Sequence, residues 1–567
     1  MSEPRRWRDP LPLESPLLSI TGNRIVDEIL ARRGFSDIEE ASAWLSPDLL
    51  RHCASAEFTG MDLVVNRIER AINGGERIRV FGDYDCDGVT SSAIMSGAVE
   101  CALAGRESVD VELPSREQGY GLRPDVIDRA INDGIMLLIA VDCGSNDLAM
   151  IEDAKSRGLD VVVIDHHQLG VEIPDGTAIV NPQRDPPSHL RAMTAAGITY
   201  LVVVCLARDG YPVAPPGKDE GIYLDLAAIG TVGDVGSLRE PMNRAIVRAG
   251  VPVLQQTRRL GLRALARQGK FDIRTMSAED ISFKITPKLN APGRIGSPDI
   301  AYKLLVATDM DSAEELATQV LDADRERKAR SEEVTARVVE ELGQEGLLTP
   351  VIVLHGESWP SGVLGPVAAK VAETHRRPAV ILGRAGEHLA GSGRSFGDWN
   401  LAEAFAQVEF LLRHGGHSKA AGLTVERDRV EELRTQLSDL YEASGLAVES
   451  EDELWIDADI GDEPVTLGLV DRIDQLGPFG AGNERPLLRW RGVQVSRWAE
   501  VGKDKTHAHV WLDKGPGPIR TIFFGGAERM RGVDPLQRVD ALVELSVNVW
   551  NQTRSVDAKL VDFQPLL

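Results

Sequence analysis

The chain has 567 residues, a hydrophobic fraction of 43% and a net charge of −24, values that exclude a mainly disordered or fibrous protein. The acidic balance argues against broad duplex binding through a basic surface. Apolar runs such as residues 198–207 are far shorter than the ~20 residues that a membrane-spanning helix needs. The N-terminus lacks the apolar core of a secretory signal. Five cysteines without a CxxC spacing argue against a disulfide framework or a structural zinc site. We therefore expect a cytoplasmic protein that needs no membrane.

The chain divides into segments of different pattern, in keeping with the roughly three to four domains that its length predicts. Residues 1–60 predict a short helical lead-in. Over residues 61–297, strands alternate with helices, which predicts βαβ units and a parallel sheet. Residues 298–346 predict connecting helices, the last of them long and charged, and we expect its charges to face solvent. Residues 347–445 predict a smaller α/β lobe, and the short strands and turns of residues 446–567 predict a β-barrel or sandwich.

The first candidate site is the segment GDYDCDG, which follows an apolar strand. Asp83, Asp85 and Asp87 are spaced i, i+2, i+4, so in an extended segment they point to one side. Gly88 would then allow a tight turn into the next helix. Three crowded carboxylates repel one another unless a cation neutralises them. A calcium-binding loop looks similar, but here a strand precedes it and no Glu occupies its twelfth position. The segment therefore predicts a different kind of divalent-metal site.

Further polar residues follow later apolar runs. Asp142 alone would suggest a helix cap, and Asp234 alone is a weak signal. Two adjacent histidines beside Asp165 are harder to explain structurally. Because ligands bind at the carboxyl ends of parallel strands, we expect these groups to meet. Mixed carboxylate and imidazole ligands suit Mn²⁺, with Mg²⁺ possible. Two ions ~3.5–4 Å apart would support hydrolysis of a phosphodiester or phosphoanhydride. The predicted metal ligands are Asp85, Asp87, Asp142, His166 and Asp234, with Asp83, Asp165 and His167 nearby.

These motifs, GDYDCDG, VDCG, DHH and the later Asp234, resemble the DHH phosphoesterase superfamily. Other motifs resemble its DHHA1 domain, namely GSGRS at 391–395 and GGHSKAAG at 415–422. Still others resemble the bacterial RecJ branch of 5′→3′ single-strand-specific DNA exonucleases, namely residues 114–122, 287–297 and 476–486. The resemblance implies that the predicted barrel is an OB-fold. It also implies the same five metal ligands. Catalytic roles would fall to Asp83, Asp165 and His167, with His167 contacting the scissile phosphate or assisting the leaving oxygen.

The resemblance further implies a set of substrate-binding residues. Arginine forks match phosphate oxygens, and glycines let backbone N–H groups approach an anion. Tyr120 could stack on a base or be a core residue, and we leave both open. The implied residues are Arg116, Tyr120, Asn290, Arg294, Ser392, Arg394, Ser395, Gly416 and His417. Three positions depart from the family pattern. Pro360 replaces the family's usual histidine, Gly233 precedes Asp234 where the family usually has alanine, and Phe81 stands where histidine is frequent.

We therefore expect a two-metal 5′→3′ exonuclease that hydrolyses single-stranded DNA to 5′-mononucleotides in recombination and repair. We expect a monomer, and the family implies a single-strand-binding protein and a helicase as partners. One alternative is a DHH phosphodiesterase for short oligonucleotides or cyclic dinucleotides, although the barrel weighs against it. Another is a non-catalytic DNA-binding replication scaffold, which the complete ligand set disfavours.

Overall fold

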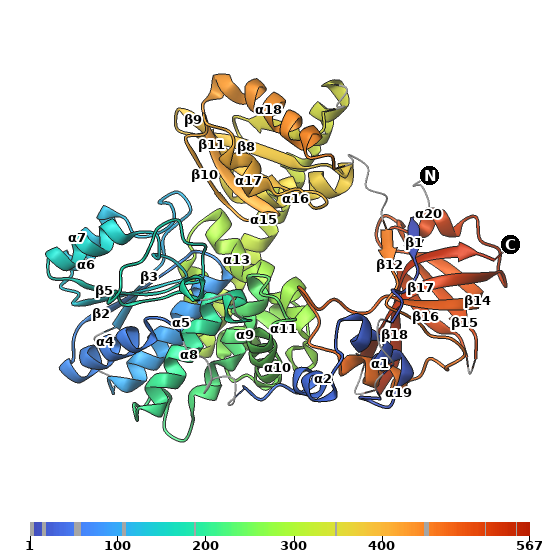
Figure 1. Ribbon diagram of the computed structural model, residues 1–567, viewed down its shortest axis with the longest axis horizontal. Coiled ribbons are helices and arrows are strands. Elements are labelled where there is room, and N and C mark those ends of the chain that lie inside the picture. The colour runs from blue at the N-terminus through green and yellow to red at the C-terminus, as the bar shows by residue number, and fades with distance from the viewer. Residues whose placement is uncertain are drawn as a thin grey trace.

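The structure is a computed structural model that describes residues 5–13, 17, 19–49, 58–104, 109–185, 189–345, 349–446, 453–515, 517–550 and 553–566. Figure 1 shows a parallel-sheet lobe at the left, a smaller α/β lobe above it and a β-barrel at the right. The predicted boundary between residues 346 and 347 lies outside the described residues. None of the described helices has the length and apolar character needed to cross a membrane.

The first lobe is built on a five-stranded parallel sheet in the order β3-β2-β4-β5-β6. The strands are β2 (Ile78–Gly82), β3 (Val109–Glu112), β4 (Leu137–Val141), β5 (Asp160–Ile164) and β6 (Ile179–Val180). Both faces are covered by buried apolar side chains. The parallel sheet predicted from the sequence is confirmed. Strand order reverses between β2 and β4, and in such sheets ligands bind at the carboxyl ends beside this reversal.

Helices cover the two faces of this sheet. The lobe's helices are α4 (Met61–Gly74), α5 (Cys86–Ala102), α6 (Pro124–Asn132), α7 (Leu148–Ser156), α8 (Ala195–Arg208), α9 (Leu224–Gly233), α10 (Pro241–Gln255) and α11 (Leu260–Gln268). α6 and α7 pack on one face, and α4, α5, α8 and α9 lie on the other. Short 3₁₀ turns join them: η1 (Pro182–Arg184), η2 (His189–Ala192), η3 (Glu220–Tyr223) and η4 (Ile273–Thr275).

A series of helices then leads out of the lobe. It starts with α12 (Ala278–Asp280), passes through the π-helix η5 (Ile281–Ile285) and continues as α13 (Thr286–Ile295), α14 (Asp299–Val306) and α15 (Met310–Glu345). α15 is the predicted long connecting helix, but its charges do not all face solvent. Asp324 is buried between Arg327 and Lys328. The expectation of a fully solvated face is therefore wrong at this position, because α13 packs closely on α15.

The second lobe has a five-stranded sheet in the order β10-β11-β9-β8-β7. Its strands are β7 (Ile352–Gly356), β8 (Ala379–Ala385), β9 (His388–Arg394), β10 (Arg413–Gly416) and β11 (Ala420–Val425). Its helices are α16 (Ser361–His375), α17 (Leu401–Ala406), η6 (Arg427–Arg429) and α18 (Val430–Ala443). β7 and β8 are parallel and the other pairs are antiparallel. Apolar clusters fill the space on each side of this sheet.

The third lobe is a barrel, as the sequence predicted. Its strands are β13 (Ala458–Asp459), β14 (Leu488–Val501), β15 (His507–Asp513), β16 (Ile519–Phe523), β17 (Arg538–Trp550) and β18 (Thr553–Pro565). The sheet closes because β17 pairs with both β18 and β14. Closure removes free strand edges. Two short helices accompany the barrel, α19 (Leu467–Asp474) and α20 (Ala527–Met530).

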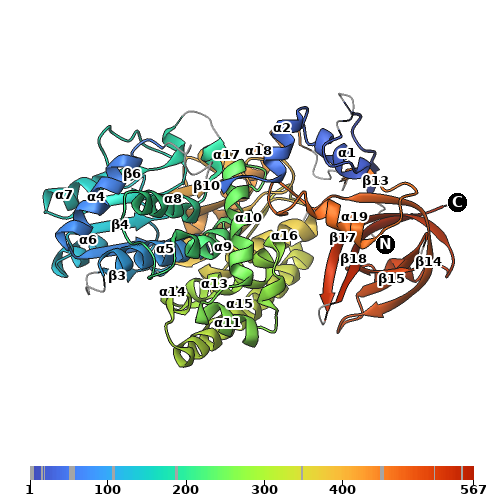
Figure 2. The same ribbon diagram turned by 90° about the horizontal axis from the view of Figure 1, so that it is seen from below.

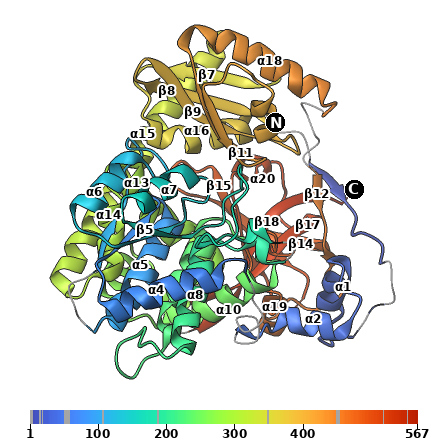
Figure 3. The same cartoon turned by 60° about the vertical axis from the view of Figure 1, so that its left-hand side comes forward.

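The N-terminal segment packs on this barrel. α1 (Arg24–Arg32) and α2 (Ile38–Leu45) share a hydrophobic cluster with the barrel strands, and Figure 3 shows them beside α19. A short strand, β1 (Arg6–Arg8), pairs in parallel with β12 (Glu453–Trp455), just ahead of the barrel. The sequence predicted only helix here. It missed β1 because a strand of three residues has no detectable periodicity.

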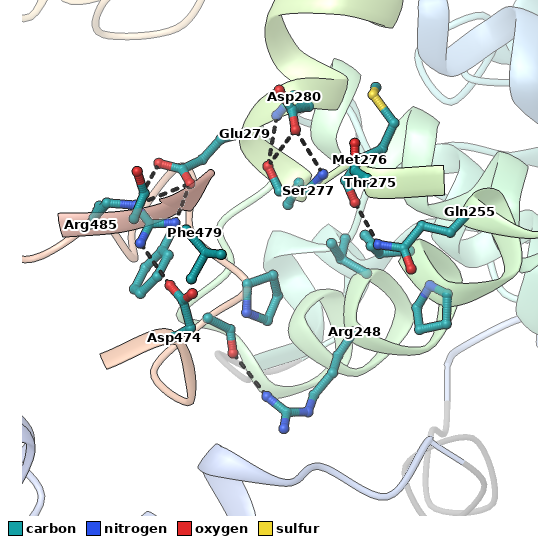
Figure 4. A pocket seen from close by; sticks show the side chains of 18 residues that line it. Arg248, Gln255, Thr275, Met276, Ser277, Glu279, Asp280, Asp474, Phe479 and Arg485 are labelled. Atoms are coloured by element: carbon teal, nitrogen blue, oxygen red, sulfur yellow. Dashed lines mark hydrogen bonds and ion pairs between the residues drawn. The ribbon is translucent and has the colours of Figure 1, made fainter. Parts of the chain in front are cut away.

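The barrel meets the first lobe through a polar clamp beside a cavity of about 530 Å³, shown in Figure 4. Arg485 donates to Glu279 Oε2 at 2.7 Å, to Asp474 Oδ1 at 2.8 Å and to the Leu545 carbonyl at 2.8 Å. Arg248 on α10 donates to the Gly477 carbonyl at 3.0 Å. Figure 2 shows α10 on the side of the lobe that faces the barrel. One guanidinium group thus links two lobes.

Candidate functional site

The connection from β2 to α5 carries the first three aspartates. Asp85 is the N-cap of α5, and its Oδ1 accepts hydrogen bonds from the backbone N–H groups of Asp87 at 3.0 Å and Gly88 at 3.2 Å. The expectation that this segment is extended through Asp87 is therefore wrong, because the cap starts the helix at Cys86. Gly88 lies inside α5 rather than at a turn into it. A Cβ at Gly88 would lie 2.5 Å from the Asp83 carbonyl oxygen, so Gly88 permits close packing.

Asp87 is held by the start of another helix. Its Oδ2 accepts from the backbone N–H of Ala195 at 2.7 Å, and its Oδ1 accepts from that of Ala196 at 2.9 Å. Both donors lie in the first turn of α8, where the helix dipole favours a negative charge. Burial, together with the charges of Asp234 and Asp85, nevertheless raises the pKa of Asp87 well above its usual range. The sequence missed these donors because backbone N–H groups leave no side-chain signature.

His166 stands among three carboxylates at the carboxyl end of β5. Its Nε2 lies 3.3 Å from Asp142 Oδ1, 3.5 Å from Asp234 Oδ2 and 3.9 Å from Asp87 Oδ2. Burial and the neighbouring His167 lower the pKa of His166 to about 4, so its ring is neutral near pH 7. A neutral imidazole is the form that binds a metal. The backbone of Asp142 is left-handed, with φ of 62°, in the conformation that brings its carboxylate beside His166.

Asp165 orients the two histidines. Its Oδ1 accepts from His167 Nδ1 at 2.8 Å and from the His166 backbone N–H at 2.7 Å. Its Oδ2 accepts from the Ser145 backbone N–H at 3.1 Å. Burial acts to lower the pKa of His167, but the bond to Asp165 outweighs it and raises that pKa to about 9. Asn181, which the sequence reading missed, donates to the His167 carbonyl at 3.0 Å. Its position directly after β6 was the available signal.

The acidic groups fit divalent cations. In each of three overlapping groups, the candidate ligand atoms lie within 4.8 Å of one another: Asp83-Asp85-Asp142, Asp142-His166-His167 and Asp87-His166-Asp234. Within the described part of the chain, Asp83 Oδ1 and Asp142 Oδ1 are buried without a hydrogen-bond partner. Burial and Asp85 raise the pKa of Asp83 to about 8, and burial and Asp85 raise that of Asp234 to about 7. A buried carboxylate oxygen without a donor is costly, and a cation would satisfy it. Carboxylate and imidazole donors suit Mn²⁺ or Mg²⁺.

Arginines from both α/β lobes lie close enough to repel one another. Burial and then Arg116 lower the pKa of Arg294 to about 9. Burial and then Arg116 also lower the pKa of Arg394. Arg394 Nη1 donates to Ser392 Oγ at 2.6 Å, and the Arg116 guanidinium stacks on Tyr84, 4.2 Å from the ring centroid. Such a cluster of cations favours an anion, and guanidinium groups match phosphate oxygens.

Tyr120 is not a core residue. Its side chain is 44% exposed, and its hydroxyl lies 3.0 Å from His167 Nδ1 and donates to the Asp142 carbonyl at 3.3 Å. It therefore stands at the metal cluster, which removes the core alternative. Burial and then His167 lower the pKa of His417, so His417 also lies near this cluster.

Three other predicted substrate residues make local contacts. Asn290 Oδ1 accepts from the Cys86 backbone N–H at 2.7 Å, which supports the acidic loop. Ser395 Oγ donates to the Trp399 carbonyl at 2.6 Å. Gly416 has a φ of 137°, and a Cβ there would lie 2.5 Å from the Ala420 carbonyl oxygen. Their roles toward substrate stay predictions.

The structure shows the surroundings of Pro360 and Phe81, two positions that depart from the family pattern. Pro360 is the N-cap of α16, and no side chain caps that helix. Gly362, two residues on, contacts Arg294, whose Nη1 donates to the Gly362 carbonyl at 3.3 Å. A Cβ at Gly362 would overlap the Arg294 backbone. Phe81 is fully buried in the cluster under α6 and α7, so the position packs the core of the sheet.

Comparisons with known proteins agree with the site. Residues 77–231 match the DHH family N-terminal domain, residues 348–443 the DHHA1 domain and residues 456–562 the RecJ OB domain. A relative from Bacillus subtilis, the single-stranded-DNA-specific exonuclease RecJ, is 31% identical over 98% of this chain and 70% of its own length. The recognition made from the motifs is confirmed.

Solved structures give the same result. The crystal structure of RecJ from Thermus thermophilus in complex with Mn²⁺ has a TM-score of 0.79 at 26% identity, and covers all of this chain and 80% of that one. The complex of the same protein with Mg²⁺ has a TM-score of 0.74 at 25% identity, over all of this chain and 79% of that one.

Proposed function

This chain belongs to the RecJ family of single-stranded-DNA-specific exonucleases, and from this premise we propose that it shortens single-stranded DNA from the 5′ end. It is a metal-dependent nuclease specific for single strands. We propose that it uses two ions, Mn²⁺ or Mg²⁺, and releases 5′-mononucleotides. One observation carries the proposal: the overlapping ligand groups lie beside an arginine cluster supplied by both α/β lobes.

The residues divide into three roles. Asp85, Asp87, Asp142, His166 and Asp234 would hold the ions, with Asp83 beside them. Cations bound there supply positive charge for the phosphoryl oxygens and activate water. Asp165 fixes the His167 ring, and His167 would donate a hydrogen bond to the scissile phosphate or to the leaving oxygen.

The arginine cluster would hold the phosphates at the 5′ end. Arg116, Arg294 and Arg394 lie beside the ligands, and each guanidinium can bind two phosphate oxygens. A 5′ end bound there would place the first phosphodiester of the strand at the metal ligands. This arrangement supports removal from an end rather than internal cleavage.

The test is a nuclease assay with Mn²⁺ on a long 3′-labelled single strand, the matching duplex and a dinucleotide. We expect stepwise shortening of the single strand from its 5′ end, with the duplex spared. Asp87→Ala should be inactive. Asp128→Ala, which removes an exposed partner of Arg157, should retain activity. Cleavage of the dinucleotide alone would favour the short-oligonucleotide enzyme, and no metal-dependent turnover would favour the scaffold.

A second assay tests the polarity. The Arg394→Lys enzyme should lose its preference for a 5′-phosphate over a 5′-hydroxyl end, since lysine cannot form the bidentate contact. An unchanged preference would contradict the assignment of this cluster to the 5′ end. A role in recombination and repair is consistent with the family. The monomeric state, the cytoplasmic location, and a single-strand-binding protein and a helicase as partners stay predictions.

A further inference from the structure

Two apolar side chains, one directly after Asp234 and one in the π-helix η5 that contacts α9, are unusually exposed. Phe283 is 79% exposed and Val235 is 72% exposed, the highest values among the large hydrophobic residues that the structure describes. A single exposed apolar residue on a surface needs no explanation. Here, however, Val235 lines one small cavity, and Phe283 directly follows Ser282, which lines the same cavity.

That cavity, of about 180 Å³, lies between the end of α9 and residues 480 and 481, which precede the barrel strand β14. Val235 lines it together with Gly233, Ser282 and Gly480. Gly233 directly precedes the ligand Asp234, and Ser282 directly precedes Phe283. Val235 lines the cavity and Phe283 lies between Ser282 and Thr286, which both line it, and we call Phe283 and Val235 the apolar step.

The helical segment that carries Phe283 also reaches the barrel. Glu279, four residues before Phe283, lines the larger cavity between the first lobe and the barrel, where Figure 4 shows it bonded to Arg485. One helical segment thus borders both cavities, and Phe283 lies on the part that borders the smaller one.

The backbone is irregular at both members of the apolar step. Phe283 is the middle residue of the π-helix η5, and such segments occur frequently at functional sites. Val235 has a φ of 58°, a left-handed conformation that a β-branched residue rarely adopts. This conformation ends α9, because the backbone N–H of Val235 donates to the Val232 carbonyl at 3.2 Å and that of Gly236 donates to the Thr231 carbonyl at 2.9 Å. The exposure of the Phe283 ring on a π-helix has no such local explanation.

We propose that the side chains of the apolar step contact nucleobases of the single strand, on the part of the strand that lies between the metal cluster and the barrel. This inference rests on the proposed function and names residues that position the same substrate. An exposed aromatic ring stacks on any base, so the contact would be tolerant of sequence. Bases within a duplex are already stacked and paired, so their faces are not available. The apolar step would therefore favour single strands.

The experiment measures binding of oligonucleotides that carry one abasic site, moved stepwise from the 5′ end, by fluorescence anisotropy. A chelator is present, so that no strand is cut. We expect the wild-type protein to lose affinity when the abasic site removes the base that stacks on Phe283, and to keep its affinity when the abasic site lies at other positions. Phe283→Ala should weaken binding of the intact strand roughly 5- to 150-fold, and it should abolish that position dependence. Phe283→Trp should retain both.

The matched control is Met136→Ala, which truncates a side chain that is 51% exposed just before β4, at the amino end of that strand and so at the other end of the sheet from the acidic groups. It should bind like the wild type. A flat abasic profile in the wild type would overturn the inference, and so would an unchanged profile in Phe283→Ala. Because binding is measured without turnover, a failure of the proposed exonuclease activity would appear only in the Mn²⁺ assay.

Discussion

The Oδ1 atom of Asp165 lies 2.8 Å from Nδ1 of His167, and Asp165 is almost completely buried. This carboxylate takes no part in the three candidate metal groups of the described residues. Its oxygens instead accept the backbone N–H groups of His166 and Ser145. Asp165 therefore fixes the imidazole ring of His167 and the backbone of His166.

Replacing Asp165 by Asn should lower activity while the fold is retained. Groups that orient metal ligands typically contribute 10- to 100-fold in metal affinity or activity, and we expect a loss of about that size in kcat/KM. The measurement is initial rate against Mn²⁺ concentration. The control is Asp160→Asn at the other end of β5, where the side chain pairs with Arg67. Equal losses in the two variants would contradict this assignment.

Asp142→Asn should separate stability from metal binding. Burial and the charges of Asp87 and Asp85 raise the pKa of Asp142 well above its usual range. Removing one negative charge from this cluster should therefore raise the Tm of the metal-free protein. Asn also tolerates the left-handed backbone at this position. Mn²⁺ should raise the Tm of the wild type by mass action, but that increase should be much smaller in the variant, and turnover should be lost.

Two results would contradict the prediction for Asp142→Asn. If Asp142→Asn lowers the Tm of the chelated protein, the carboxylate stabilises the fold through contacts other than a cation. If Mn²⁺ raises the Tm of the variant as much as that of the wild type, Asp142 is not a metal ligand. Thermal unfolding with a chelator and with added Mn²⁺ distinguishes these outcomes.

The sequence could predict which strand ends carry the acidic groups, because short apolar runs ended in aspartate or histidine. It could not predict how those groups are held. The donors to Asp87 are backbone N–H groups of Ala195 and Ala196, which become neighbours only when α8 packs on α5. Likewise, β1 exists because it pairs with β12, more than 400 residues along the chain. The exposure of Phe283 depends on tertiary packing, which a single sequence does not reveal.

Asp324 should make the stability of the protein depend on pH. Burial opposes its ionisation, but bonds from Lys328 at 2.7 Å and Arg327 at 2.8 Å outweigh burial and lower its pKa. A carboxyl with a lowered folded-state pKa stabilises the fold above its unfolded pKa, near 3.9. That contribution is lost as pH falls through the folded-state pKa.

Asp324→Asn should therefore lower the free energy of unfolding at pH 7 by about 1–3 kcal/mol. The difference from the wild type should shrink below pH 4, where Asp324 becomes protonated. Urea unfolding across this pH range is the measurement. Asp322→Asn, at a side chain that is 56% exposed and pairs with Arg325, should change stability by less than about 0.5 kcal/mol. A constant difference at all pH values would show that ionisation of Asp324 is not the cause.

Arg485 should couple the barrel to the catalytic lobe. Its side chain is only 12% exposed, and it bonds Glu279 on one lobe and Asp474 and Leu545 on the other. Removing Arg485 leaves the carboxylates of Glu279 and Asp474 without this partner, but their side chains are 34% and 36% exposed, so we expect a cost of about 1–3 kcal/mol. Arg485→Ala should therefore loosen the contact between the lobes, and calorimetry should show the barrel unfolding at a lower temperature, separated from the first lobe.

A double-mutant cycle with Glu279→Gln isolates the contribution of this contact. The two substitutions together should cost less than the sum of the single ones, since they remove the same bond. Arg491→Ala is the control, because Arg491 is 56% exposed and pairs with Asp459 inside the barrel. Exact additivity in the cycle would mean that the lobes are held by other contacts, such as that of Arg248 with Gly477. In that case the strand path along the apolar step would not depend on the clamp at Arg485, and Arg485→Ala should leave binding of long single strands unchanged.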